Sequence, residues 1–359
     1  MNQNVNPKNK SKIHFELAPD LGTLSYDSTK KYFTIFGLAI FAFSAATLAA
    51  QTVLVYLISF LVPNIAEMPR ALTAANYILS FVPLYLVGLP VLMAILKKLP
   101  SVRLLKQKMT LSHAFGGFCI GILFMLTGNL VSNYLMILLQ SLKGGAISNP
   151  VESATVGNPW WLNLIFVGIL APILEEILFR KIICSRLLPL GEGWAIFLSA
   201  AVFGLAHGNF YQFFYAFALG ALFAFIYVKT GKLIYSTVYH MAINIIGGVI
   251  APLLSELISR PEFSALLDPQ AQVVDLSPEN MAALLGTMSA YLIYLAGLYG
   301  MAIAGIVLLI KAINKKKLSL DAGLLPPVKE GKFSALFMNV GVALSIAYFT
   351  LSFTTSILS

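Results

Sequence analysis

Three ionisable side chains lie close together in a stretch that is otherwise apolar. The segment APILEEILFR at 171–180 carries Glu175, Glu176 and Arg180. Glu176 and Arg180 are four residues apart, so on a helix they share a face, with the carboxylate on the N-terminal side that favours an ion pair. Glu175 points about 100° away from Glu176. The spacing predicts that Glu176 pairs with Arg180 and that Glu175 is free to face a cavity.

Three further polar side chains follow in two later apolar runs. His207 ends the segment FGLAH, and HMAIN carries His240 and Asn244, which are four residues apart and share a helical face. If the chain turns near Gly191, Glu175 and His207 both lie roughly 24 Å along their helices from that turn. From a turn near Gly231, the HMAIN residues lie roughly 14–20 Å away. We therefore expect these groups to share one layer, reached from one side.

This set of groups suits the hydrolysis of an amide bond. A carboxylate and a histidine on either side of a water molecule can activate it as a nucleophile. A second histidine and an asparagine amide can donate hydrogen bonds to the oxyanion that then forms. A different chemistry fits the same residues, because Glu175, His207 and His240 could bind zinc as a His₂Glu set with water in the fourth position. The spacing alone leaves both alternatives open.

The composition indicates that these residues lie inside a membrane. Of the 359 residues, 58% are hydrophobic and 11% are charged, whereas a soluble domain has about 25% charged residues. Several uncharged runs reach the ~20 residues that cross a hydrocarbon core. We expect an all-α, polytopic membrane helical bundle with about 8–9 transmembrane helices. The candidate spans are 33–62, 76–96, 113–140, 160–187, 193–207, 211–229, 233–254, 283–311 and 333–357.

The basic residues give the expected orientation of these spans. Every second loop is basic, and the loop at 255–282 is acidic, which predicts a cytoplasmic N-terminus under the positive-inside rule. The net charge of +9 could suggest nucleic acid as a partner. Because the charges cluster between hydrophobic runs, we expect the lipid bilayer as a partner and no nucleic acid.

The spans and loops divide the chain into five regions. These are a cytoplasmic N-terminal tail (1–32), N-terminal transmembrane helices (33–159), a core of transmembrane helices that carries the polar motifs (160–255), an extracytoplasmic loop (256–282), and C-terminal transmembrane helices (283–359) with a basic cytoplasmic linker (312–332). We expect the linker to be solvated.

The three motifs resemble those of one membrane-protein family. EEILFR matches the EExxxR motif of the CAAX-protease and bacteriocin-processing (CPBP) family, which includes the type II CAAX prenyl endopeptidases and their bacterial relatives. FGLAH matches its FxxxH motif, HMAIN matches its HxxxN motif, and the order and spacing agree over 160–255. Together the three motifs are quite specific, whereas each one alone would be weak.

The resemblance implies an intramembrane endopeptidase with a membrane-associated protein or peptide as its substrate. The implied catalytic residues are Glu175, His207, His240 and Asn244, with Glu176 and Arg180 as supporting residues. Members of the family are often described as metalloproteases, but a metal-free glutamate mechanism is also proposed for the fold. We favour the metal-free mechanism, which requires no cofactor. Relatives act on prenylated C-terminal peptides or are linked to bacteriocin processing and immunity, and we expect a bacterial plasma membrane.

Two functions of other classes use the same residues. A proton-coupled transporter also places Glu and His inside the membrane, but the chain lacks paired Gly/Pro-broken helices in corresponding halves. A catalytically silent scaffold would use the polar cluster for stability while it binds a membrane partner.

Overall fold

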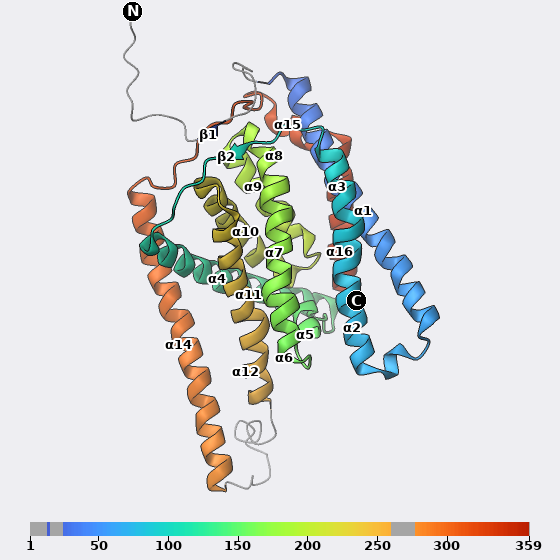
Figure 1. The fold of residues 1–359 in the computed structure, drawn as a ribbon, viewed down its shortest axis with the longest axis vertical. Helices are drawn as coiled ribbons and strands as arrows, with labels where there is room; N and C mark the ends of the chain where they lie inside the picture. Colours follow the sequence, from blue (N-terminus) through green and yellow to red (C-terminus); the bar gives the residue numbers. More distant parts are fainter. Residues whose placement is uncertain (1–12, 15–23, 260–276, 359) are drawn as a thin grey trace, which may run out of the picture.

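The computed structural model describes residues 13–14, 24–259 and 277–358, and most of them lie in helices (Figure 1). The predicted all-α fold is confirmed. The strands β1 (Ile13–His14) and β2 (Arg103–Leu104) form one short antiparallel pair. The α-helices are α1 (Tyr26–Leu61), α2 (Pro69–Val82), α3 (Leu89–Leu96), α4 (Leu111–Lys143), α5 (Pro150–Thr155), α6 (Trp160–Leu162), α7 (Ala171–Glu176), α8 (Ser185–Leu187), α9 (Glu192–Ala206), α10 (Phe210–Thr230), α11 (Leu233–Ile245), α12 (Ala251–Ile258), α14 (Pro278–Asn314), α15 (Lys332–Phe337) and α16 (Val340–Leu358).

Wider and narrower helical turns join several of these helices end to end. The π-helical segments of the described chain are η3 (Pro83–Gly88), η4 (Asn163–Leu170), η5 (Ile177–Cys184) and η7 (Ile246–Ile250), and the 3₁₀ turns are η2 (Ile65–Glu67) and η6 (Leu188–Leu190). The helix that carries Glu175 is therefore one long rod from α6 through η4, α7 and η5 to α8. π-helical turns are rare and occur frequently at functional sites.

Eight helices of the described chain are long and apolar enough to cross a membrane, which agrees with the predicted number. The predicted span at 193–207 corresponds to α9, which has 15 residues and is about 22 Å long. This is less than the ~30 Å of a hydrocarbon core. The predicted span at 333–357 is divided into α15 and α16, because the Asn339 side chain accepts a hydrogen bond from the Val342 N–H and starts a new helix.

The two turns used to estimate depth are confirmed. Gly191 precedes α9 with a φ of 121°, and Gly231 ends α10 with a φ of 61°, which are backbone conformations that glycine adopts readily. α9 starts directly after Gly191 and ends after 15 residues at Ala206, and His207 follows directly after it.

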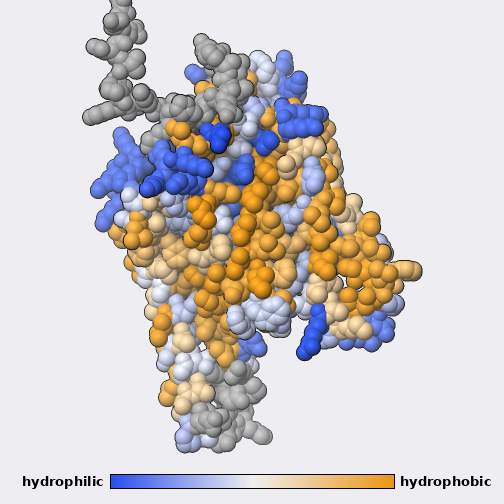
Figure 2. Space-filling model, viewed as in Figure 1, coloured by the Kyte–Doolittle hydropathy of each residue, from blue (hydrophilic) through white to orange (hydrophobic). Residues whose placement is uncertain are grey.

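The basic loops lie together at one end of the bundle. The Gln107 N–H donates to the Thr230 carbonyl, and the Val102 N–H donates to the Ser185 carbonyl, so the β2 loop contacts two other basic turns. Figure 2 shows hydrophilic side chains gathered at the end that carries β2 and α15, next to a broad apolar region. This grouping is what the positive-inside pattern requires, and the assignment of this end to the cytoplasm stays a prediction.

The linker at this end is less free than expected. Its lysines Lys315–Lys317 are exposed, but its main chain is fixed to the turn before α9. The Leu325 N–H donates to the Pro189 carbonyl at 2.8 Å, and the Glu192 N–H donates to the Asp321 carbonyl at 3.1 Å. Peptide groups of the η6–α9 turn thus bind the part around 321–325, while Asp321, Ala322 and Leu324 stay exposed. Sequence spacing gives no signal for such a contact.

The N- and C-terminal helices cross where two glycines meet. A Cβ atom added to Gly37 of α1 would overlap the backbone of Gly341 in α16, and one added to Gly341 would overlap the backbone of α1 near Thr34. Ser345 Oγ also donates to the Gly37 carbonyl at 2.8 Å. Small residues allow this close packing of membrane helices, in which van der Waals contact and interhelical hydrogen bonds supply the stability.

Replacing Gly341 by leucine should therefore separate α16 from α1. We expect a loss of about 1–3 kcal/mol in the free energy of unfolding, because the added side chain has no space at the crossing. Unfolding in detergent micelles, followed by circular dichroism, measures this loss. Gly300→Leu is the matched control, since no atom lies within 4 Å of the position of its added Cβ. Equal stability of the two variants would contradict the crossing.

Candidate active site

The predicted ion pair between Glu176 and Arg180 is present. Arg180 Nη2 lies 3.2 Å from Glu176 Oε1, and both side chains have no exposed surface. Apart from this pair, the guanidinium nitrogens have no hydrogen-bond partner within the described part of the chain. Aromatic rings surround the guanidinium instead, with its carbon 4.7 Å from the Phe203 centroid and 5.7 Å from that of Phe223. Cation–π attraction to these rings partly replaces the hydrogen bonds that water would give.

His240 lies between two carboxylates. Its Nδ1 is 3.1 Å from Glu176 Oε1, and its Nε2 is 3.5 Å from Glu175 Oε2. An ionised carboxylate only accepts hydrogen bonds, so Nδ1 carries a proton where it contacts Glu176. The second contact is longer than a normal hydrogen bond, and it places His240 Nε2 next to the partly exposed Glu175 carboxylate.

This contact corrects the expectation that Glu175 is unpaired. Glu175 is directed to His240 on α11, and 22% of its side chain is exposed, whereas none of the Glu176 side chain is. The two adjacent carboxylates still differ in their surroundings, but both now have a partner. Glu176 is the buried partner of Arg180 and His240, and Glu175 is the partner of His240 that a substrate or water can reach.

His207 presents one ring nitrogen to the site. Its Nδ1 lies 2.8 Å from the carbonyl oxygen of Phe203, one helical turn earlier. A carbonyl oxygen only accepts, so Nδ1 carries the proton and a neutral ring keeps a lone pair on Nε2. That nitrogen can take a proton from water. His207 also lies close enough to Glu175 and His240 for their charges to act on it.

One aromatic ring joins the two histidines. The Phe203 ring packs edge-on against His207, with centroids 5.1 Å apart, and against His240, with centroids 5.5 Å apart. On the other side, Phe223 of α10 stacks on His240 at 5.0 Å and 28°. His240 thus contacts both carboxylates directly, and His207 is linked to His240 through the Phe203 ring.

Asn244 contacts the helix that carries Glu175 about two turns before Glu175, and not at the position where His240 contacts it. Its Nδ2 donates to the Val167 carbonyl in η4 at 3.0 Å. One of the two amide N–H groups is thus used to join two helices, and the other is left for a substrate. The role of Asn244 as an oxyanion donor therefore stays a prediction.

The contacts of two rings around the cluster were not predicted from the sequence. Phe203 begins the FGLAH motif, four residues before His207 on the same helical face, but the motif gave its ring no role. Phe223 gave no such signal, since its contact with His240 joins two different helices. Tyr85 of η3 and Tyr215 of α10 also lie close enough to Glu175 to interact with its charge.

The alternative chemistry predicted from the sequence is a zinc site formed by Glu175, His207 and His240. Within the part of the chain that the structure describes, no group of three His, Cys, Asp or Glu side chains has an arrangement that could hold a metal ion. Each histidine uses Nδ1 for a hydrogen bond to the protein, and His240 Nε2 faces Glu175 directly. Histidines that bind zinc through Nε2 also hydrogen-bond their Nδ1 to the protein, so zinc binding by Glu175, His207 and His240 stays a prediction, and the steps proposed below use only residues of the chain.

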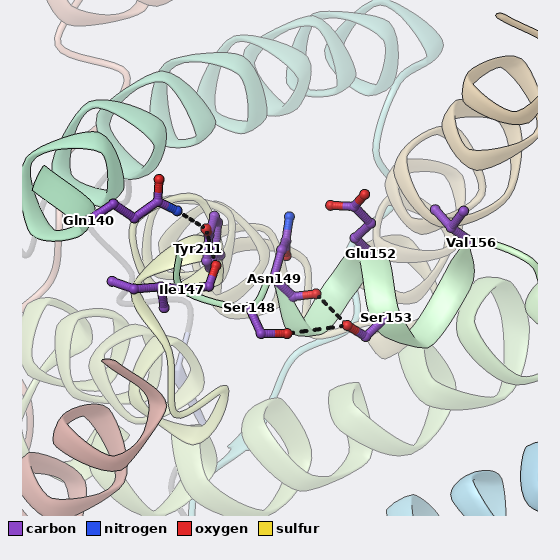
Figure 3. Close-up of a pocket in the computed structure, with 8 residues that line it drawn as sticks. All are labelled: Gln140, Ile147, Ser148, Asn149, Glu152, Ser153, Val156 and Tyr211. Atoms are coloured by element: carbon purple, nitrogen blue, oxygen red, sulfur yellow. Dashed lines mark hydrogen bonds between the residues drawn. The ribbon is translucent and has the colours of Figure 1, made fainter. Parts of the chain in front are cut away.

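A separate cavity lies beyond the α9–α10 turn. It has a volume of about 610 Å³ and is lined by side chains of α4, α5, the loop between them and the start of α10 (Figure 3). Gln140 Nε2 donates to the Tyr211 hydroxyl, and the Tyr211 hydroxyl donates to the Ile147 carbonyl, which ties the loop to α10. None of the six predicted site residues lines this cavity.

Comparison with known proteins supports the resemblance seen in the sequence. Residues 157–246 match the family described as type II CAAX prenyl endopeptidase Rce1-like, and all six predicted site residues lie in this range. The chain is 30% identical over 117 residues to the membrane-embedded CAAX protease MroQ of Staphylococcus aureus (strain USA300), which is 30% of this chain and 47% of that protein. It is 34% identical over 84 residues to the putative membrane peptidase YdiL of Bacillus subtilis (strain 168), which is 23% of this chain and 34% of that protein. These matches span less than half the length of each relative, and no solved structure matches the chain.

Replacing Arg180 by methionine should destabilise the fold strongly. The change leaves the Glu176 carboxylate buried with only His240 as a partner, and breaking a buried pair in this way costs about 3–5 kcal/mol. Titration of the purified protein with SDS in mixed micelles measures the loss. Arg70→Met is the matched control, because Arg70 is exposed. The double variant Glu176→Gln/Arg180→Met should recover part of the stability, and a double variant no more stable than Arg180→Met would contradict the pairing.

Proposed function

We propose that this protein is an intramembrane endopeptidase that hydrolyses a peptide bond of a membrane-associated substrate. The observation that carries the proposal is the contact of His240 with two carboxylates, one buried and one accessible, beside a second histidine with a lone pair. The match of 157–246 to a peptidase family supports the same activity. A serine or cysteine nucleophile is not required for this chemistry.

In the proposed reaction, water is the nucleophile. Glu175 takes one proton from the water molecule, whose other O–H donates a hydrogen bond to His207 Nε2, as the water oxygen bonds to the carbonyl carbon of the substrate. The carbonyl oxygen becomes an oxyanion, to which His240 and the second N–H of Asn244 donate hydrogen bonds. The carbon–nitrogen bond then breaks and the proton passes to the leaving amine. The products are a new carboxylate terminus and a new amino terminus.

In this proposal Glu176 and Arg180 have supporting roles. The Glu176 carboxylate holds His240 Nδ1 and so directs Nε2 toward Glu175, while Arg180 balances the charge of Glu176. A hydrogen bond to one ring nitrogen fixes which nitrogen faces the site. Neither side chain has exposed surface, so neither one contacts substrate in this proposal.

The proposed substrate is a peptide or protein held in or at the membrane. Prenylated C-terminal peptides and bacteriocin precursors are two members of this class, and the second would connect the protein to bacteriocin processing or self-immunity. We propose a bacterial plasma membrane with the N-terminus in the cytoplasm. The basic loops at one end support this orientation, and both named relatives are bacterial.

Replacing Glu175 by glutamine should abolish proteolysis and leave the fold intact, because the amide keeps the shape of the side chain but cannot take a proton. Mass spectrometry of peptide termini in membranes and medium, from cells with matched expression, should find termini that occur with the wild type and not with the variant. Glu67→Gln is the control, since Glu67 is exposed in η2, far along the chain from the site. The terminus that is lost also identifies the substrate class.

The same experiment addresses the alternative functions. Identical peptide profiles together with a retained biological phenotype in Glu175→Gln would favour a membrane scaffold, in which the Glu176–Arg180–His240 network only joins helices. A proton-coupled transporter would instead show uptake that depends on a proton gradient in sealed vesicles.

The two histidines should differ in their effect on stability. His207→Asn should lower the rate of peptide cleavage by about 10²–10⁴-fold, with little change in the thermal midpoint, because its hydrogen bond is local to α9. His240→Asn should lower both the rate and the midpoint, since it also removes the partner of Glu176 on α11. Cleavage of the identified substrate in proteoliposomes and thermal unfolding in detergent measure the two effects. A His207 variant as unstable as the His240 variant would contradict this assignment.

A further inference from the structure

A proline follows three of the four π-helical segments of the described chain at the same distance. Pro90 follows η3, Pro172 follows η4 and Pro252 follows η7, each two residues after the last π-helical residue. A proline ring clashes with the carbonyl four residues earlier and removes a main-chain donor. A wider helical turn moves that carbonyl away from the ring. The backbone groups that are freed inside a membrane must then find other partners.

At Pro172 the freed group can be identified. The Ala171 N–H donates to the Phe166 carbonyl, five residues earlier, as in a π-helix. In the same register the next hydrogen bond would join residue 172 to the Val167 carbonyl, but proline has no N–H. The donor at the Val167 carbonyl is Asn244 Nδ2 of α11, at 3.0 Å. A side chain from another helix thus replaces the hydrogen bond that Pro172 cannot make.

Two glycines allow the helices to come close enough for this contact. A Cβ atom on Gly168 of η4 would lie 3.0 Å from the Ile245 side chain, and one on Gly248 of η7 would lie 2.8 Å from the Val167 side chain. Each glycine thus makes room for a side chain of the opposite helix. The packing on both sides of Asn244 fits the hydrogen bond to Val167.

The contact lies on the same two helices as the catalytic cluster. Glu175 is eight residues after Val167, or about 12 Å along the helix, and His240 is one turn before Asn244. The two helices are therefore joined at two levels, by His240 with the carboxylates and by Asn244 with the Val167 carbonyl. Two attachments fix the rotation of one helix against the other, which a single contact does not.

We propose that Pro172 is a positioning residue that acts through the Val167 carbonyl and Asn244. It keeps the main chain from occupying this carbonyl, so that Asn244 binds it and holds Glu175 and the second amide N–H of Asn244 in place for the reaction. The proposal rests on the proposed peptidase function for its catalytic part. The hydrogen bond itself can be tested without any activity.

The first test is a double-mutant cycle on the thermal midpoint of the purified full chain in detergent. Asn244→Leu should lower the midpoint by about 1–3 °C, because it leaves the Val167 carbonyl without a donor. In the Pro172→Ala background the same change should have little effect, since the carbonyl gains an N–H from residue 172 in a π-helix or from Ala171 in an α-helix. Equal losses in the two backgrounds would overturn the proposal.

The second test measures the kinetics of peptide cleavage. Its substrate is the one whose product terminus occurs with the wild type and is lost in Glu175→Gln. Pro172→Ala should lower kcat by up to about 10²-fold with an unchanged KM, because small displacements of catalytic groups have effects of this size. Pro69→Ala is the control and should keep the wild-type kcat, since Pro69 is exposed at the start of α2. Wild-type kcat in Pro172→Ala would overturn the positioning role. If the wild type forms no product, the peptidase function fails, while the midpoint cycle still decides whether the Val167–Asn244 contact depends on Pro172.

Discussion

The fold depends on how the buried Glu176 carboxylate is compensated. A charge without partners in an apolar interior costs so much free energy that the surrounding structure must supply them. Arg180 supplies one from the same helix, and His240 supplies the other from α11. The second contact holds the two helices at a fixed level, and it sets which nitrogen of His240 faces Glu175. The structural charge and the reactive carboxylate are therefore adjacent in the sequence but separate in function.

Aromatic rings surround the Arg180 guanidinium on the sides where it has no oxygen acceptor within the described chain. Phe203 contacts both histidines and the guanidinium of Arg180, and Phe223 closes the other side of His240. The rings exclude water from the ion pair, which strengthens its electrostatic attraction. They belong to two separate apolar clusters of the core, so the site lies where these clusters meet. Packing and electrostatics thus position the same side chains.

The backbone of the bundle is adapted to the site as well. The short helix α9 ends at Ala206, directly before His207, whose ring packs against Phe203 of the same helix. The rod from α6 to α8 contains two π-helical segments on either side of Glu175 and Glu176. At the basic end, the linker around 321–325 binds the turn before α9 through main-chain hydrogen bonds. The linker between α14 and α15 thereby holds the start of α9, the helix that precedes His207.

The sequence by itself determined the features that depend on short spacing. Four-residue spacing on one helix sets the Glu176–Arg180 pair, hydrophobic length sets the number of spans, and Gly191 and Gly231 set the turns before α9 and after α10. Only the tertiary structure decided the contact of Glu175 with His240, the acceptor of Asn244, the ring of Phe223 on His240 and the docking of the linker. Each of these joins segments that are far apart in the chain. Helical periodicity fixes the direction of a side chain on its own helix, but the partner it meets depends on how two helices rotate and pack against each other.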